Sequence, residues 1–324
     1  MQGGASLRNA KLAYKTYGKL NSSGDNAIVV PTFYGGSHRD IEPMIGQGKA
    51  LDPAKYFIIV PNLFGNGVSS SPSNTSGPYG RARFPGVTVY DNVVSQHRLV
   101  TEVLGVRRVA LVTGNSMGAL QTNQWGALYP ALVERIVPVC GSARISHHNF
   151  VFLEGVKSAL TADDAFKDGW YESPPAKGLR AFGRVYAGWA LSQAWYRQEV
   201  YLQIGYSSLE DYLVEFWEGR RMDSDANDLL AMLWTWQHAD ISANSSFNGD
   251  FDAALGAIGS KAIVMPCRTD LYFPPEDNAY EVSLMPNAEL RPIESIWGHL
   301  AGSPGANADD TRFVDAALKE VLAR

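Results

Sequence analysis

Short runs of β-branched and other apolar residues alternate along this chain with segments of helical periodicity. This alternation is typical of α/β proteins, in which helices cover both faces of a parallel sheet. Most of the runs are continuously apolar, as expected for strands that are buried on both sides. The predicted strands are Leu12–Tyr17, Ala27–Phe33, Tyr56–Pro61, Val109–Thr113, Ile136–Cys140, Lys261–Cys267 and Glu289–Ile293. The predicted helices are Asp91–Leu104, Met117–Tyr129, Glu276–Leu284 and Asp309–Leu322, with a surface loop at Ser69–Pro85. The fold class is therefore α/β, with a mostly parallel central sheet.

The strand pattern stops between about Ile145 and Leu255. Tryptophans at helical spacings take its place, and such large rings are expected mainly in the core or an interface, with a minority lining a pocket. With 324 residues, 45% of them apolar, the chain is long enough for one large domain that carries an insertion. We therefore predict an α/β core made of residues 1–144 and 256–324, and an inserted helical cap made of residues 145–255.

The most specific motif, Gly114-Asn115-Ser116-Met117-Gly118, lies between a predicted strand and a predicted helix. A GxSxG turn in this position holds a nucleophilic serine in a strained conformation, and side chains larger than glycine would collide with the neighbouring strand and helix. The turn raises the Ser116 hydroxyl above the sheet edge. It also directs the Met117 amide, at the positive end of the helix, towards a developing oxyanion. The motif therefore predicts nucleophilic catalysis by Ser116, with Met117 as one oxyanion donor.

Two later residues complete a catalytic triad in the order serine, acid, histidine that this turn requires. Asp270 stands in a polar loop after the strand Lys261–Cys267, and the carboxyl ends of strands are where such sites are built. His299 follows the last predicted strand, and it is the one histidine that stands in a loop after both a strand and the acid. We predict that Ser116, Asp270 and His299 act together.

A second oxyanion donor is expected from the loop after an early strand, here Pro31–Gly36. Gly35 and Gly36 would let a substrate approach the backbone closely, although the same glycines also suit an ordinary turn. Because the donor is a backbone amide, the side chain carries little information. Tyr34 is the predicted donor.

Other chemistries find no support in the sequence. The formal charge is −5 and the basic residues are scattered, so neither nucleic acid nor a membrane is an expected partner. No phosphate-binding loop, GxGxxG after the first strand, HExxH or CxxC occurs, and no cofactor or metal is expected. Cys140 and Cys267 lie in apolar runs and are expected to be reduced structural thiols. Without a signal peptide or a membrane-spanning stretch, a cytoplasmic protein is expected.

Several motifs resemble the homoserine O-acetyltransferase branch of the α/β hydrolases. They are Asp91–Val94, Gln96–Leu99, the turn Gly114–Gly118 with Gln121 and Trp125, Pro130, and the acid and histidine loops. The resemblance implies an α/β-hydrolase fold, a Ser116–Asp270–His299 triad, an oxyanion donor at Tyr34 and a homodimer formed partly through the cap. It also implies that the serine accepts an acetyl group from acetyl-CoA, which would be a co-substrate.

The sequence departs from this family at positions that concern the substrate. Family members usually have Gly-His-Asp at the histidine, where the aspartate binds the amine of homoserine, whereas this chain has Gly298-His299-Leu300. The early loop has Thr32-Phe33-Tyr34-Gly35 in place of His-Ala-Leu-Thr. The resemblance assigns Arg184 to the cap arginine that would hold the substrate carboxylate, although a surface or salt-bridge role fits it equally.

These departures favour hydrolysis of a small ester or related carbonyl compound over acyl transfer. The alternatives are an acetyl-CoA-dependent O-acyltransferase and, from another class, a noncatalytic binding protein on the same fold. Both enzymatic alternatives share the acyl-enzyme. They differ in whether water or an alcohol accepts the acyl group.

Overall fold

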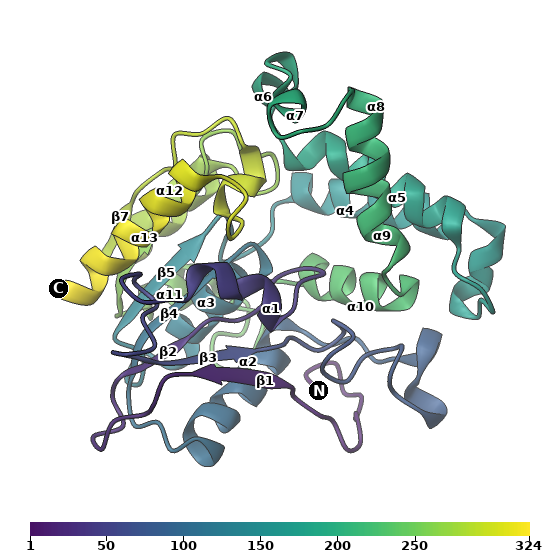
Figure 1. Ribbon diagram of the computed structural model, residues 1–324. Helices are drawn as coiled ribbons and strands as arrows, with labels where there is room; N and C mark the ends of the chain where they lie inside the picture. Colours follow the sequence, from purple (N-terminus) through teal and green to yellow (C-terminus); the bar gives the residue numbers. More distant parts are fainter.

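The computed structural model describes residues 1–324, which are built around a seven-stranded, mostly parallel sheet (Figure 1). The strand order is β1-β3-β2-β4-β5-β6-β7, and only β1 is antiparallel to its neighbour, β3. The strands are β1 (Tyr14–Tyr17), β2 (Ala27–Val29), β3 (Phe57–Pro61), β4 (Val109–Asn115), β5 (Arg135–Val139), β6 (Lys261–Val264) and β7 (Ala288–Leu290). The predicted α/β class is confirmed, and every predicted strand is present.

Four strands, β1, β2, β6 and β7, are clearly shorter than predicted, and in β2 and β6 a proline interrupts the hydrogen bonding. β2 ends two residues before Pro31, and β6 ends at Val264, shortly before Pro266. Proline has no amide hydrogen to donate to a sheet. Beyond β6 only isolated bridges, at Met265 and Cys267, continue the pairing. The chain is thus released from the sheet just before the acid loop.

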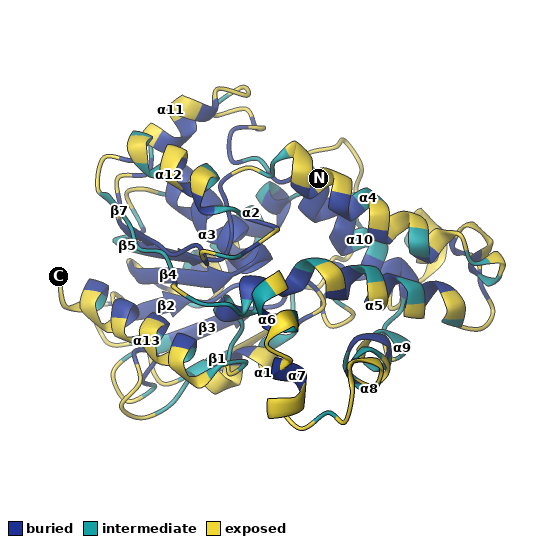
Figure 2. Cartoon of the chain, turned by 90° about the horizontal axis from the view of Figure 1, so that it is seen from above, coloured by how far each residue is buried: buried dark blue, intermediate teal, exposed yellow.

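Helices cover both faces of the sheet, α1 and α13 one face and α2, α3, α11 and α12 the other (Figure 2). Successive strand residues face opposite sides, so each strand contributes to two cores. In β2, for example, Ile28 packs in the smaller core under α13 and Val29 in the larger core under α2 and α3. The helices are α1 (His38–Ile41), α2 (Val89–Arg98, continued by a π-helical turn, Leu99–Val103), α3 (Met117–Leu128), α11 (Phe251–Gly256), α12 (Pro275–Leu284) and α13 (Ala308–Ala323).

The remaining α-helices lie between β5 and α11 and form a separate layer beside the sheet (Figure 1). They are α4 (His147–Thr161), α5 (Ala176–Ala190), α6 (Gln193–Arg197), α7 (Val200–Gln203), α8 (Leu209–Tyr212), α9 (Gly219–Met222) and α10 (Ala226–Gln237), with a 3-10 segment at Asp164–Gly169 and a π-helical segment at Leu213–Glu218. We call this layer the cap. Its apolar side chains belong to the same cluster as the larger core of the sheet. The division of the chain at residues 145 and 255 therefore stays a prediction.

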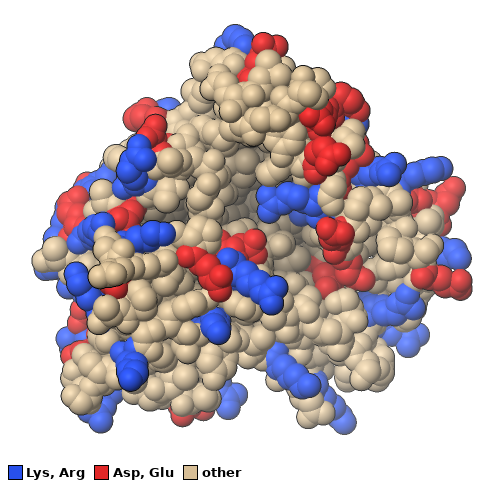
Figure 3. Space-filling view, in the orientation of Figure 1, with Lys and Arg blue, Asp and Glu red and all other residues tan.

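The face of the molecule in Figure 3 carries acidic and basic side chains side by side, and it is hollowed beneath the lobe at its top. None of the helices combines the length and the apolar character needed to cross a membrane.

The predicted surface loop Ser69–Pro85 contains two short 3-10 turns, Gly77–Tyr79 and Arg81–Arg83. Among the 3-10 turns outside the cap are also Glu42–Met44 and Gly298–Gly302, and the second of these contains His299.

Candidate active site

Ser116 lies in a sharp turn between β4 and α3. Its backbone has φ 55° and ψ −125°, a region that residues other than glycine seldom adopt and that costs about 1–3 kcal/mol. Two glycines make the turn possible. A Cβ at Gly114 would lie 2.7 Å from the carbonyl carbon of Gly118, and a Cβ at Gly118 would lie 2.7 Å from the carbonyl oxygen of Pro31. Because both obstacles are backbone atoms, the turn has the geometry that the motif predicts.

The structure brings the three predicted triad side chains together. His299 Nε2 lies 2.9 Å from Ser116 Oγ, and His299 Nδ1 lies 2.8 Å from Asp270 Oδ2. All three residues are buried, with at most 6% of each exposed. Since a carboxylate can only accept, Nδ1 carries the proton of a neutral imidazole, which leaves Nε2 to accept from the serine hydroxyl. This is the tautomer that a general base needs.

Backbone amides hold the carboxylate of Asp270 in place. Tyr272 N and Phe273 N donate to Oδ1 at 2.8 and 3.3 Å, which leaves Oδ2 for His299. The ring of Tyr272 packs against the imidazole with 4.5 Å between centroids. The Asp270 carboxylate and the His299 imidazole therefore have little freedom to rotate away from each other.

Ser295 steadies the loop that leads to His299. Its hydroxyl donates to Asp310 Oδ2 on α13 at 2.7 Å and accepts from Trp297 N at 3.1 Å. Burial raises the pKa of Asp310, although the Ser295 hydrogen bond acts in the opposite direction. The segment before His299 is thus hydrogen-bonded to α13, which covers the face of the sheet opposite to α3.

Two backbone segments next to Ser116 have amides that donate to no other atom of the protein. Met117 begins α3, where an amide has no intrahelical acceptor. In the loop after β2, the amides of Phe33 and Tyr34 are also free, and both residues line a cavity with Ser116. The Tyr34 hydroxyl donates to Leu229 O at 3.0 Å. Free amides are therefore available at both predicted donor positions and, in addition, at Phe33.

The cavity beside Ser116 has a volume of about 70 Å³ and lies between the sheet and the cap. Its wall is mostly aromatic, and the rings of Tyr34 and Tyr186 stack 6.0 Å apart. Of the cap tryptophans only Trp217 is in the wall, while Trp195 and Trp236 are fully buried in the packing. The lining residues are Phe33, Tyr34, Asn115, Ser116, Tyr186, Phe216, Trp217, Arg220, Arg221, His299 and Leu300. Since one water needs about 10–15 Å³ of such space, this cavity suits a small substrate group.

Arg220 and Arg221 reach this cavity from α9, and neither is among the residues predicted from the sequence. Neither guanidinium lies within 4.0 Å of a carboxylate. The Arg221 guanidinium is 4.8 Å from the centre of the Tyr186 ring, and its Nε is buried without a hydrogen-bond partner. A pair of arginines in a helical segment usually indicates a solvated face. Nothing in the local sequence therefore pointed to the cavity.

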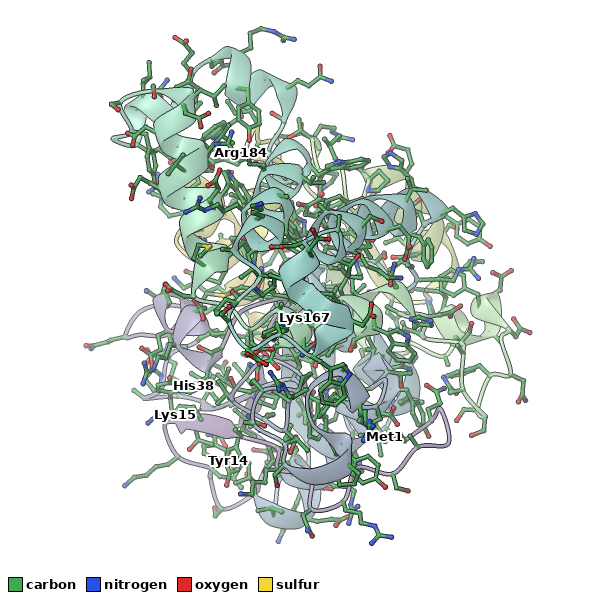
Figure 4. All side chains as sticks on the ribbon, turned by 90° about the vertical axis from the view of Figure 1, so that its right-hand side faces the viewer. Met1, Tyr14, Lys15, His38, Lys167 and Arg184 are labelled. Carbon is green, nitrogen blue, oxygen red and sulfur yellow. The ribbon has the colours of Figure 1, made fainter.

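The two residues predicted to contact substrate have different positions. Leu300 lines the cavity next to His299. Arg184 does not: it lies among the cap helices (Figure 4) and is paired with Glu210 and Glu218. Its position therefore supports the salt-bridge role and not the substrate-binding role.

Cys140 and Cys267 are free and buried, as predicted. Burial raises the pKa of both thiols, which disfavours the nucleophilic thiolate. No group of three His, Cys, Asp or Glu side chains is placed to hold a metal ion.

The fold, the strained serine turn and the hydrogen-bonded histidine and aspartate define a class of enzyme, the serine hydrolases of α/β type. A family model described as "alpha/beta hydrolase fold" matches residues 28–301. The chain belongs to this family and is an enzyme of its serine hydrolase and acyltransferase class. The noncatalytic alternative is accordingly set aside.

Individual relatives agree with this assignment. An ethyl acetate hydrolase of Pseudomonas veronii is 40% identical over 99% of this chain and 92% of its own length. The crystal structure of an acetylester hydrolase from Corynebacterium glutamicum is 38% identical, covers 100% of this chain and 93% of its own, and has a TM-score of 0.96. A homoserine O-acetyltransferase of Trichormus variabilis is 31% identical over 92% of this chain and 86% of its own length. The resemblance to the homoserine O-acetyltransferase branch is confirmed.

Proposed function

We propose that the protein hydrolyses small esters through an acyl-enzyme formed on Ser116. The observation that carries the proposal is the chain of hydrogen bonds from Ser116 Oγ through His299 to Asp270, in the wall of a cavity of about 70 Å³. The small cavity favours an acetyl group as the acyl part of the substrate, and so does the similarity to an ethyl acetate hydrolase and to an acetylester hydrolase.

In the first half of the reaction, Ser116 Oγ attacks the carbonyl carbon of the ester while His299 Nε2 accepts the hydroxyl proton. Asp270 stabilises the imidazolium that results. The negative charge on the former carbonyl oxygen is stabilised by the Met117 amide and by an amide of the loop after β2, for which Tyr34 is our assignment. The alcohol then leaves with the proton from His299, and the acyl group stays on Ser116.

In the second half, a water molecule replaces the alcohol. His299 accepts a proton from the water as its oxygen attacks the acyl carbon, and returns the proton to Ser116 Oγ when the acid leaves. The net reaction consumes one water and produces an alcohol and a carboxylic acid. No cofactor takes part in either half.

Transfer of the acyl group to an alcohol is the second candidate, with acetyl-CoA as donor. It is favoured by Arg220 and Arg221, because guanidinium groups without a carboxylate partner are suited to an anionic group of a donor or acceptor. Leu300 opposes homoserine as that acceptor, since an apolar side chain cannot pair with an ammonium group. Hydrolysis therefore stands first.

The test of the proposed function is Ser116→Ala. Loss of a triad nucleophile costs about 10⁶ in kcat, so turnover of p-nitrophenyl acetate should disappear while the protein stays folded. Ser260→Ala is the matched control, because it removes another buried serine hydroxyl. Ser260 directly precedes β6, and its hydroxyl donates to Val133 O. Mass spectrometry after brief mixing should find one acetyl group on the wild-type protein and none on Ser116→Ala. An alanine variant that keeps more than about a tenth of the activity would exclude Ser116 as nucleophile.

We also propose that the protein is a homodimer formed through the cap. Leu202, Ile204, Leu209 and Val214 expose between 40% and 45% of their surface on the α7–α8 side of the cap. Exposed apolar residues that lie close together are typical of protein interfaces. Sedimentation as a monomer at micromolar concentration would disprove this.

A further inference from the structure

A row of three buried side chains runs beside the nucleophile turn. Trp125 Nε1 on α3 donates to Gln96 Oε1 on α2 at 3.0 Å, and Gln96 Nε2 donates to Gln121 Oε1 at 2.6 Å. Gln121 Nε2 then donates to the carbonyl oxygens of Thr32 and Met117, at 2.9 and 3.0 Å. Trp125, Gln96 and Gln121 are each at most 1% exposed. We call these three residues the glutamine relay.

Chemistry fixes the direction of every hydrogen bond in the relay. An indole N–H can only donate and a backbone carbonyl can only accept, so both ends are unambiguous. The two amides between them can then have only one orientation. Turning either amide over would set donor against donor or acceptor against acceptor in a fully buried place, and a buried polar group without a hydrogen-bond partner is destabilising. The Gln121 amide is therefore held firmly.

The two carbonyl groups that Gln121 binds belong to the segments that flank Ser116. The Thr32 carbonyl shares a planar peptide unit with the Phe33 amide, so that C=O and N–H point in opposite directions. Holding the Thr32 oxygen therefore sets the direction of the Phe33 N–H and the start of the loop that continues to Tyr34. The other carbonyl belongs to Met117. One amide nitrogen thus joins the loop after β2 to the first turn of α3.

We propose that Gln121 is a positioning residue for the oxyanion hole, and that Gln96 and Trp125 hold its amide in the working orientation. The proposal rests on the proposed function, because it concerns the backbone amides that would stabilise the oxyanion. None of the three relay residues lines the cavity. They therefore act only through the backbone of Thr32–Tyr34 and Met117.

The first test is Gln121→Met, which keeps the length of the side chain and removes its hydrogen bonds. Deleting an oxyanion donor lowers kcat by about 10²–10³, so misdirecting one should lower kcat by about 10- to 100-fold with little change in KM. A trifluoromethyl ketone that forms a tetrahedral adduct with Ser116 should bind more weakly by a similar factor. This second readout reports on the oxyanion and not on general packing.

Thr122→Val is the matched control. Thr122 is fully buried in the same turn of α3, and its hydroxyl donates to Gly118 O at 2.8 Å and makes no hydrogen bond to Thr32. It should leave kcat and inhibitor affinity within about threefold of wild type. The proposal is wrong if folded Gln121→Met also stays within about threefold in both.

Gln121→Glu provides an independent test should the methionine variant not fold. A protonated glutamic acid can still donate to Thr32 O and accept from Gln96, whereas a carboxylate would face two carbonyl oxygens. Burial raises a carboxyl pKa in this protein to about 8 at Glu281. The ratio of Gln121→Glu to wild-type kcat should therefore fall as the pH rises from about 6 to about 10. A ratio that does not change over this range contradicts the proposal.

Ser116→Ala separates this proposal from the proposed function. If Ser116→Ala keeps its activity, the serine mechanism itself is wrong, and the relay proposal is wrong with it. If Ser116→Ala is inactive and both Gln121 variants behave as wild type, only the relay proposal is wrong.

Discussion

The hydroxyl of Thr269 donates to the carbonyl oxygen of Ser295 at 2.8 Å and so connects the loop of Asp270 with the loop of His299. The same hydroxyl accepts from Gly298 N at 3.2 Å. Thr269 directly precedes the acid, and Gly298 directly precedes the histidine. A single side chain therefore contributes to the spacing between Asp270 and His299.

Thr269→Val should consequently lower kcat without unfolding the protein. The valine keeps the shape and loses both hydrogen bonds, and a displacement of the Asp270–His299 pair worth about 1.4 kcal/mol corresponds to a tenfold loss. Thr269→Ser retains the hydroxyl and should stay close to wild type. Steady-state hydrolysis of p-nitrophenyl acetate measures the effect, and equal kcat values for the two variants would show that the hydroxyl has no such role.

Leu300 should keep homoserine from serving as an acyl acceptor. A missing charge-assisted hydrogen bond to the ammonium group is worth about 1.5–3 kcal/mol, or roughly ten- to a hundredfold. With an acetyl donor, millimolar homoserine should neither accelerate deacylation nor yield O-acetylhomoserine in the wild type. Leu300→Asp should raise any residual transfer, whereas the uncharged Leu300→Asn should not. Saturable wild-type formation of O-acetylhomoserine from acetyl-CoA, faster than ester hydrolysis, would establish the transferase instead.

Arg221 should discriminate between neutral and anionic substrates. Its guanidinium lies in the cavity wall with no carboxylate partner within 4.0 Å. Arg221→Met should therefore raise KM for an acetyl ester that carries a carboxylate by about tenfold or more, and change KM for ethyl acetate much less. Arg184→Met, which removes an arginine already paired with two glutamates, is the control and should affect both esters alike. Equal losses on both esters for Arg221→Met would argue against an anion site.

Glu281 should make the protein less stable as the pH rises. Its carboxyl group is buried, accepts from Ala143 N at 2.6 Å and from Asn278 Nδ2 at 2.8 Å, and burial raises its pKa to about 8. Because the folded state holds this proton more tightly than the unfolded state, the stabilisation is complete below about pH 4.5 and is lost as the pH passes through about 8.

Glu281→Gln cannot ionise, so its free energy of unfolding should fall less than that of the wild type between about pH 5 and about pH 8.5. Urea unfolding at the two pH values measures the difference. Glu276→Gln changes an exposed carboxylate on the same helix and should keep the wild-type pH dependence. If Glu281→Gln has the same pH dependence as the wild type, Glu281 does not titrate in this range.

The pattern of the sequence predicts much of the fold because strand and turn preferences are local. The proline at position 31 or 266 alters only where a strand ends, by removing one donor. The pattern predicts the individual helices of the cap less well, because several of them, such as α7 and α8, have only four residues each. Segments this short have no helical period, and their form depends on what they pack against.

The residues of the sequence by themselves determined the α/β architecture, the strained turn at Ser116 and the order of serine, acid and histidine. These features depend on glycines that no other residue can replace in a tight turn, and on chemistry carried by single side chains. Only the tertiary structure decided that Arg221 and not Arg184 reaches the cavity, and that Gln121 binds the carbonyl groups beside the serine. These contacts join residues that are far apart in the chain. They therefore depend on how separate helices and loops pack against one another, which the local sequence does not specify.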